Sequence, residues 1–332
     1  MSGVQAEGHS TAQRIGRLLG GPPPRHTRAE VAEMSGVPPE LAERIWRALG
    51  FASVAADAPA FTDADVAALQ RVGSMLGDEM LDEATVIRMA RALGRTTSRL
   101  AQWQAEIMMG AMIRPGAGHG EEDLGRVLDA ARRLLPDFEH VLVHVWRAQL
   151  AAAGTRLLTV AGLDDDFEPR RTTIAVGFAD LVSFTQHARE LDEYALGDLV
   201  EGFESRAADV VAARGARLVK TLGDEVLFTA AEPGVAAEVA FDLVDAVRER
   251  DDGPDVRIGL AYGPVLPMMG DVFGTTVNLA ARLTAIARPG TVLSDEPLAL
   301  ALDGAQGVEA HRIRRRPARG LGVVQPYVLR RT

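Results

Sequence analysis

The chain has 332 residues, 47% of them hydrophobic, which excludes a disordered protein and is enough to bury a large core in two domains. A formal net charge of −10 argues against DNA as the main partner, and the absence of cysteine excludes disulfides and thiolate metal sites, as is usual in the reducing cytosol. No apolar run approaches the ~20 residues that span a bilayer, and the first residues lack the order of a signal peptide, so we expect a soluble, cytoplasmic protein.

Residues up to about 113 have a helical periodicity broken by glycine and proline, which predicts an all-helical region. Thr27 is placed to cap a first helix, residues 36–39 predict a tight turn, and Leu41 to Leu49 predict a second helix. Residues 35–37 and 44–51 resemble the start of a MerR-type helix-turn-helix. Because the chain is acidic, we interpret this unit as a packing element rather than a DNA-binding one.

Three segments divide the rest of the chain. Residues 115–120 (Pro-Gly-Ala-Gly-His-Gly) predict a flexible break, and Glu121 to Leu150 predict a helix interrupted at Pro136. The acidic residues 164–169 predict a solvated linker. We therefore expect an all-helical domain with a linker helix over residues 1–165 and a second domain over residues 166–332.

From Arg171 onward, strand and helix patterns alternate. The first half of this region predicts a strand over Thr172 to Ala179, a helix over Leu191 to Ala213, and a hairpin around Gly223 formed by Ala216 to Thr221 and Val226 to Ala230. The second half predicts a helix over Val235 to Arg248, a strand over Val256 to Tyr262 and a helix over Thr276 to Ile286. This order predicts an α+β fold with a ferredoxin-like palm, in which the first strand lies beside the hairpin.

Two carboxylates stand at the ends of predicted strands. Asp180 ends the first strand, and Asp224 follows Gly223 in the hairpin turn. In the palm layout these residues meet at one edge of the sheet. Two like charges held close together repel unless a cation bridges them, and a paired-metal site of this kind activates an oxygen nucleophile against phosphorus.

Three motifs in order resemble those of the class III nucleotidyl cyclases. Residues 178–185 (Phe-Ala-Asp-Leu-Val-Ser-Phe-Thr) resemble the first metal motif of that family, and residues 220–224 (Lys-Thr-Leu-Gly-Asp) resemble the second. Residues 270–283 resemble the substrate and transition-state motif. The resemblance covers the chain from about Thr172 to Leu329, and the helical region before it resembles regulatory domains that precede some actinobacterial cyclases.

The resemblance implies a palm cyclase catalytic domain that converts ATP to cyclic AMP and pyrophosphate, preceded by an all-α regulatory domain. Asp180 and Asp224 would then hold two Mg²⁺ or Mn²⁺ ions, which lower the pKa of the ribose 3′-hydroxyl and neutralise the triphosphate. Glu225 is either a further ligand or, as we expect, a solvated turn residue.

Asn278 and Arg282 lie four residues apart on a predicted helix and therefore project from the same face. The resemblance implies that Asn278 orients the ribose and that Arg282 stabilises charge on the α-phosphate; without it, the two would be an ordinary surface pair. The family often has Lys-Gly-x-Gly near the C-terminus, where this chain has an arginine in place of the lysine. Arg319 is therefore the candidate triphosphate contact.

Lys220 and Asp271 are the candidate base-reading pair. Adenine offers a ring-nitrogen acceptor and an amine donor, which a lysine and a carboxylate complement. Guanine would set its carbonyl oxygen against the Asp271 carboxylate, a mismatch of roughly 1 to 3 kcal/mol. The pair therefore predicts ATP over GTP.

The resemblance also implies an assembly. In the family, each active site lies at a dimer interface, with the metal and base-reading residues from one subunit and the Asn/Arg pair from the other. Because this chain carries both sets, we expect a homodimer with two equivalent sites.

Two weaker signals concern regulation by the N-terminal domain. His140 and His144 lie four residues apart on a predicted helix, where protonation could bias packing, although such a pair is more often solvated. The methionine-rich residues 107–113 could line a groove for a fatty acid or other lipid, although core packing or a dimer interface is the expected role.

Three other functions remain as alternatives. Lys220 and Asp271 disfavour a guanylate cyclase. Residues 223–225 echo the Gly-Gly-Asp-Glu-Phe signature of diguanylate cyclases, but Leu222 breaks that echo. A non-catalytic nucleotide-binding or DNA-binding regulator would not need the complete set of metal and transition-state residues.

Overall fold

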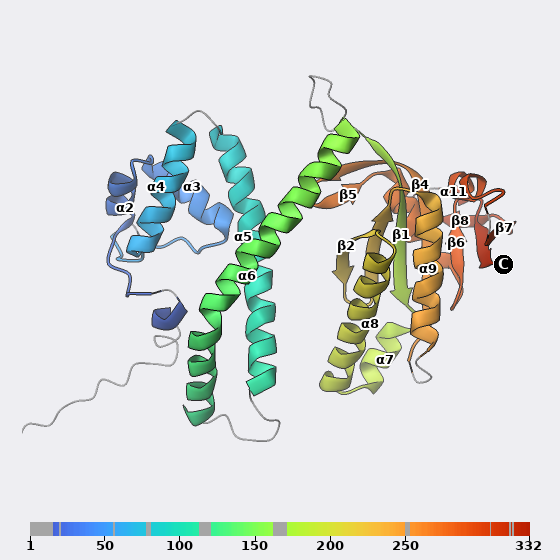
Figure 1. The fold of residues 1–332 in the computed structure, drawn as a ribbon, viewed down its shortest axis with the longest axis horizontal. Coiled ribbons are helices and arrows are strands. Elements are labelled where there is room, and N and C mark those ends of the chain that lie inside the picture. The colour runs from blue at the N-terminus through green and yellow to red at the C-terminus, as the bar shows by residue number, and fades with distance from the viewer. Residues whose placement is uncertain are drawn as a thin grey trace, which may run out of the picture. The chain divides into compact units, whose positions relative to one another are not determined.

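The computed structural model describes residues 16–19, 21–55, 57–77, 81–112, 121–161, 171–249, 253–305, 307–318, 320 and 322–332. Within it, the chain divides into two compact units, Met1–Ala153 and Gly154–Thr332 (Figure 1). The predicted break at 115–120, the predicted linker at 164–169 and Arg319 lie outside the described residues.

The N-terminal unit is built from helices, as predicted. These are α2 (Arg28–Ser35), α3 (Pro39–Leu49), α4 (Asp63–Gly77), α5 (Glu83–Met112) and the part of α6 (Glu121–Ala161) up to Ala153. A core of apolar side chains from α2, α3, α4 and α5 includes Val31, Leu41, Ile45 and Leu69.

The predicted helix, turn and helix over residues 27–49 are confirmed. The Thr27 side chain accepts from the backbone of Glu30, and the Glu30 carboxylate accepts from the Thr27 N–H at 2.7 Å, so the two residues form a capping box. Gly36 ends α2 at a φ of 71°, a left-handed conformation that glycine adopts without strain.

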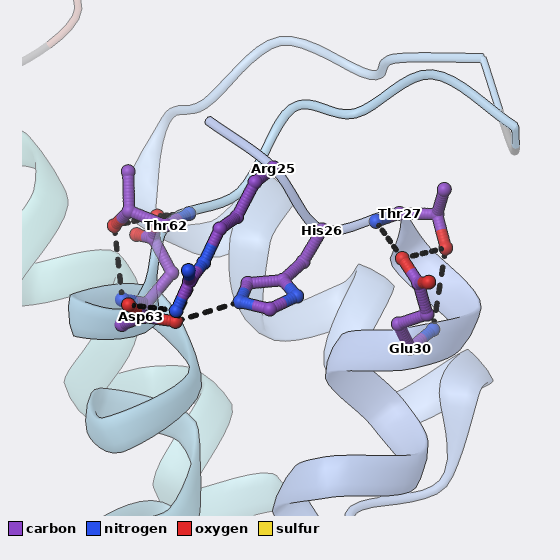
Figure 2. A network of polar contacts seen from close by, with 7 residues as sticks. Arg25, His26, Thr27, Glu30, Thr62 and Asp63 are labelled. Carbon is purple, nitrogen blue, oxygen red and sulfur yellow. Dashed lines mark hydrogen bonds and ion pairs between the residues drawn. The ribbon is translucent and has the colours of Figure 1, made fainter. Parts of the chain in front are cut away.

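A polar network joins the start of α2 to the start of α4 (Figure 2). The backbones of His26 and Phe61 pair through hydrogen bonds of 3.0 and 3.1 Å. The Asp63 carboxylate lies 2.7 Å from His26 Nε2 and accepts from Arg25 Nη2 at 2.5 Å. Hydrogen bonds from Arg25 and His26 hold the pKa of the Asp63 carboxyl below its usual range, and the positive charge of Arg25 adds to the effect.

The interruption predicted at Pro136 is wrong. α6 continues through the proline and ends at Ala161, beyond the predicted end at Leu150. Proline lacks the N–H that would bond the carbonyl four residues earlier, but the long helix-forming sequences on both sides keep the backbone helical. His140 Nδ1 lies 2.7 Å from the Pro136 carbonyl oxygen, one turn away.

The C-terminal unit is built on a sheet with the strand order β2-β3-β1-β4-β6-β10-β7. β5 pairs with β4, and β8 and β9 form a separate hairpin. The strands are β1 (Thr172–Leu181), β2 (Arg217–Leu222), β3 (Glu225–Ala230), β4 (Val256–Met268), β5 (Asp271–Phe273), β6 (Val292–Ser294), β7 (Val308–Arg312), β8 (Arg316–Ala318), β9 (Gly322–Val324) and β10 (Tyr327–Arg331).

The first four strands of this order form the predicted ferredoxin-like layout. β1 pairs antiparallel with both β3 and β4, and β2 forms an antiparallel hairpin with β3. β6 continues the sheet in parallel with β4. The helices between the strands are α7 (Phe184–Glu190), α8 (Glu193–Ala213), α9 (Pro233–Arg248), α10 (Thr275–Ile286) and α11 (Glu296–Ala301).

Helices cover the two faces of the sheet differently. α8 and α9 pack on one face, where Phe203 and Leu243 join Ala179 and Phe228 in the larger core cluster; both helices lie in front of the sheet in Figure 1. On the opposite face, called here the α10 face, Ala280 of α10 packs with Val176, Phe178 and Leu227. Because side chains alternate along a strand, residues of the same parity as Val176 on β1 lie on the α10 face.

Candidate active site

The two candidate metal ligands meet at one edge of the sheet, as the sequence predicts. Asp180 is the next-to-last residue of β1 and shares the α10 face with Val176 and Phe178. Asp224 lies in the turn between β2 and β3, and its carbonyl oxygen accepts from the Leu181 N–H at 3.0 Å. Gly223 enters this turn at a φ of 69°. The hairpin therefore brings Asp224 to the end of the strand that carries Asp180.

Glu225 opens β3 directly opposite Asp180. Its side chain is half-buried, so the expectation of a solvated turn residue is wrong. Burial raises the pKa of the Glu225 carboxyl, and the negative charges of Asp180 and Asp224 raise it further. The end of the hairpin thus holds a third carboxylate close to the predicted pair.

The guanidinium group of Arg257 adds a positive charge to this acidic cluster. It lies opposite Asp180 on the other neighbouring strand, β4, and its Nε and Nη2 atoms are 2.7 and 2.5 Å from Asp180 Oδ2. Burial raises the pKa of the Asp180 carboxyl, while Arg257 lowers it and Asp224 raises it. Sequence reasoning missed Arg257, whose only signal is a charged residue at the start of an otherwise apolar strand.

The donor set at this edge fits a hard divalent cation. Carboxylate oxygens are the ligands that Mg²⁺ and Mn²⁺ prefer, and both Arg257 donors bind the same oxygen of Asp180, Oδ2. Across the described part of the chain, no group of three or more His, Cys, Asp or Glu side chains is arranged to hold a metal. Asp180 and Asp224 would therefore hold cations together with water and substrate oxygens, as Mg²⁺ sites commonly do.

The candidate base-reading pair is assembled within the chain. Lys220 Nζ lies 2.6 Å from Asp271 Oδ2. The other oxygen, Asp271 Oδ1, accepts from the Val272 N–H at 2.8 Å. Lys220 lies opposite Leu227 and so projects from the α10 face, the face that also carries Asp180.

Asn278 and Arg282 do not join the acidic cluster of the same chain. α10 turns Thr276, Ala280, Leu283 and Thr284 toward the sheet and leaves Asn278 and Arg282 exposed. Among the residues that the structure describes, neither side chain makes a hydrogen bond or an ion pair. The single chain therefore presents this pair outward.

Both units match known protein families. Residues 168–331 match the adenylate and guanylate cyclase catalytic domain, and residues 10–153 match the adenylate cyclase regulatory domain. An adenylate cyclase of Streptomyces coelicolor is 43% identical over 96% of this chain and 90% of that protein. An adenylate cyclase of Streptomyces griseus is 41% identical over 96% of this chain and 89% of that protein.

The chain belongs to the adenylate cyclase family. This assignment makes the chain an enzyme of the lyase class, and it confirms the predicted cyclase fold and the predicted helical regulatory domain. A more distant relative, the pH-sensitive adenylate cyclase of Mycobacterium tuberculosis, is 31% identical over 83% of this chain and 70% of that protein.

The candidate regulatory residues of the cyclase lie on α5 and α6. His140 and His144 are exposed, as are Ile107 and Met109, at 66% and 49% of their full surfaces. Within the described part of the chain, Ile107 and Met109 therefore do not pack into a core, and Ile113 lies outside the described residues. Among the helices that the structure describes, none is long and apolar enough to span a membrane.

Proposed function

We propose that the cyclase converts ATP to 3′,5′-cyclic AMP and pyrophosphate. In this reaction the ribose 3′-oxygen forms a bond to the α-phosphorus, the bond from that phosphorus to the bridging oxygen breaks, and pyrophosphate and a proton are released. The observation that carries the proposal is the Lys220–Asp271 pair, with its atoms 2.6 Å apart on the face that holds Asp180. A base-reading pair and an acidic cluster on one sheet face are what a nucleotide cyclase needs.

Asp180 and Asp224 are the proposed ligands of two Mg²⁺ or Mn²⁺ ions. Bound there, the ions would lower the pKa of the 3′-hydroxyl and offset the charge of the triphosphate. The raised pKa of Asp180 and Glu225 supports this assignment, because crowded and partly buried carboxylates gain most from a bound cation.

Lys220 and Asp271 are the proposed determinants of base choice. Lys220 would donate to the adenine ring nitrogen, and Asp271 would accept from the exocyclic amine. Each carboxylate oxygen of Asp271 accepts one hydrogen bond in the chain and has capacity for another. Guanine would place its carbonyl oxygen against this carboxylate, which disfavours GTP.

We propose that Asn278 and Arg282 complete the active site of a partner subunit in a homodimer. Their exposure on α10 supports this arrangement. Arg282 would meet the α-phosphate, for which a planar guanidinium has the right donors, and Asn278 would orient the ribose. Arg319 remains the proposed triphosphate contact.

The apolar surface of the long helices also supports a homodimer. Large hydrophobic side chains that are exposed on a single chain are commonly covered by a partner, because isolated chains seldom expose large apolar patches. Among the side chains of α5 and α6 that the structure describes, the exposed large hydrophobic ones are Met89, Leu93, Trp103, Ile107, Met109, Leu134, Phe138, Val141, Leu142, Val143, Val145, Trp146 and Leu150.

Product analysis tests the proposed reaction. Purified protein is incubated with ATP or GTP and Mn²⁺, and the products are separated by chromatography and identified by mass. We expect cyclic AMP from ATP and far less cyclic GMP from GTP. Asp180→Ala should abolish the product, whereas Asp209→Ala, an exposed acid on α8, should not. Absence of any cyclic nucleotide, or a preference for GTP, would refute the proposal.

We further propose that residues 1–165 regulate the catalytic domain at 166–332, through pH or a bound lipid. The exposed pair His140 and His144 supports the first signal, and the exposed apolar end of α5 supports the second. Deleting residues 1–165 should change the basal rate and its profile between pH 5 and 8, and added fatty acid should act only on the full chain. Identical profiles for both proteins would contradict a regulatory role.

A further inference from the structure

An extra residue in β2 changes which side chains share a face. Leu218 pairs with Phe228 and Lys220 pairs with Leu227, so Val219 is a β-bulge between them. In a regular strand, residues three apart lie on opposite faces. With the extra residue, Arg217 and Lys220 face the same way.

The shared face is the α10 face. Arg217 lies opposite Thr229 and Lys220 lies opposite Leu227, which are two residues apart on β3. Leu227 belongs to the apolar cluster under α10, and Val219 packs against the same cluster. The bulge therefore directs two cationic side chains from β2 toward the same part of the sheet.

The two side chains contact consecutive residues, the last residue of one turn and the first residue of the strand that follows it. Arg217 Nη2 donates to the Gly270 carbonyl oxygen at 2.6 Å, and Lys220 Nζ lies 2.6 Å from Asp271 Oδ2. The turn is the two-residue connection between β4 and β5, since Met268 pairs with Asp271. Arg217 thus binds the backbone of the turn at Gly270, and Lys220 binds the side chain of the next residue, Asp271.

This turn has a backbone that needs support. Met269 and Gly270 have φ angles of 53° and 81°, as in the tight turns that best fit twisted hairpins. Glycine adopts such angles freely, but Met269 carries a Cβ that disfavours the left-handed region. The hydrogen bond from Arg217 to the Gly270 carbonyl therefore holds the turn in one backbone conformation, where the turn alone would sample others.

We propose that Arg217 is a positioning residue for base recognition. By holding the Gly270 carbonyl, it fixes the backbone immediately before Asp271, so that the carboxylate faces the adenine amine before the nucleotide binds. Lys220 reads the base and Arg217 does not touch it. This inference rests on the proposed function and extends it, since it assigns part of the ATP preference to a residue outside the base-reading pair.

The role predicts a particular kinetic effect. Without the tether, the Lys220–Asp271 ion pair can still form, but the turn samples other conformations and the nucleotide must order it on binding. The KM for ATP should rise and the preference for ATP over GTP should fall. The turnover of bound ATP should change little, because Arg217 is not assigned to the acidic cluster.

The experiment compares Arg217→Met, Arg217→Lys and the control Arg330→Met, which changes an exposed arginine on β10. For Arg217→Met we expect a KM for ATP about tenfold higher, the ratio of kcat/KM for ATP and GTP about tenfold lower, and kcat within about twofold, a loss on the scale of one hydrogen bond to a charged group. Arg217→Lys should recover part of the effect, because it keeps a donor. Arg330→Met should match the wild type.

A second measurement does not depend on activity. Hydrogen exchange followed by mass spectrometry, without nucleotide, should show faster exchange over residues 266–273 in Arg217→Met and unchanged exchange in the control. Unaltered selectivity in a folded Arg217→Met protein, or unaltered exchange at the turn, would overturn the inference while leaving the proposed function intact. A wild type that cyclises neither ATP nor GTP would refute the proposed function and the base-reading role together.

Discussion

The pKa of the Asp180 carboxyl depends on residues from the neighbouring chain segments on both sides of β1. Glu225 lies opposite Asp180 on β3, and the charge of the neighbouring Asp224 raises the pKa of Asp180, whereas Arg257 lies opposite it on β4 and lowers its pKa. The Asp180 side chain is only 13% exposed, so its ionised form depends on this partner. The ion pair favours the charged form of this carboxyl and fixes its orientation.

Arg257→Gln should therefore destabilise the metal-free protein. The change leaves a partly buried carboxylate beside two others, at a cost of about 1–3 kcal/mol. Added Mn²⁺ should recover more stability in the variant than in the wild type, which thermal unfolding with and without the ion measures. In the double variant with Asp180→Asn, the penalty should largely disappear, because no charge is left unpaired. Equal losses in the single and double variants would contradict this account.

Asp295 is a buried carboxyl outside the proposed chemistry. It caps α11 by accepting from the Leu298 N–H at 3.0 Å, and it also accepts from the Tyr262 N–H. Burial raises its pKa to about 6 despite these bonds. Because the folded-state pKa lies above the ordinary value, the folded protein binds this proton more tightly than the unfolded chain does, and stability falls as pH rises from about 4 through 6.

Asp295→Asn should remove this pH dependence. Asparagine keeps the cap and carries no charge, so the variant should be more stable than the wild type above pH 6, by up to about 3 kcal/mol, and no more stable near pH 4. The three tryptophans, Trp46, Trp103 and Trp146, lie outside the C-terminal unit, so tryptophan fluorescence would not report on the unfolding of that unit. Hydrogen exchange over residues 256–305, corrected for intrinsic rates, is therefore the suitable measurement. A stability difference that is the same at pH 4.5 and 7.5 would show that the charge of Asp295 is not responsible.

Sequence reasoning worked well for residues whose role follows from their motif, and poorly for residues whose role follows from register. Lys220 and Asp271 were paired on chemical grounds, and the structure brings them to 2.6 Å. Arg257 and Arg217 were missed because their partners are set by the pairing of β1 with β4 and by the bulge in β2. Neither pairing can be read from one strand alone.

At the scale of elements, the close contact of α10 with β4 depends on a glycine, Gly259. A Cβ on Gly259 would lie 2.2 Å from the Thr284 nitrogen and 2.5 Å from the Ala280 carbonyl oxygen, both in the backbone of α10. Thr284 also donates to the Phe178 carbonyl oxygen at 3.2 Å, which ties the helix to β1. The position of Asn278 and Arg282 relative to the sheet is set by this close approach.

Gly259→Ala should displace α10 and weaken the C-terminal unit. Because the clashing atoms are backbone, we expect a loss of about 3 kcal/mol and a fall in cyclase activity. Gly234→Ala is the matched control, since a Cβ on this glycine of α9 meets nothing within 4 Å. Hydrogen exchange over β4 and α10 measures the effect. A variant as protected as the control would mean that the helix is not held by this contact.

Some of the strands that sequence reasoning missed are too short to be predicted. β6, β8 and β9 have three residues each, too few to show an alternating pattern. β4 was expected to end at Tyr262 but continues through Pro264 to Met268. Proline is tolerated there because β6 pairs only with Ile258 to Leu260, so the missing N–H faces no neighbouring strand. The other long elements of the ferredoxin-like core, by contrast, were predicted within about two residues at each end.

At the scale of the whole molecule, complementation tests the proposed composite site. Asp180→Ala and Asn278→Ala proteins, each inactive alone, are mixed under conditions that exchange subunits. Each mixed dimer has one intact site, and random exchange makes half of the dimers mixed, so activity should return to about a quarter of the wild type. A mixture of Asp180→Ala with Asp224→Ala should remain inactive, because both changes affect the same half of the site. No recovery in mixed dimers verified by two affinity tags would refute the shared site.

The two aspartates differ in how firmly the backbone holds them. Asp180 belongs to a strand that is hydrogen-bonded on both sides, whereas Asp224 sits in the short loop of a hairpin next to a glycine. The distance between their carboxylates can therefore widen or narrow by adjustment of the loop alone. In the proposed metal site, tolerance for cations of different ionic radius would then lie in a few loop residues, and the sheet would not have to deform to provide it.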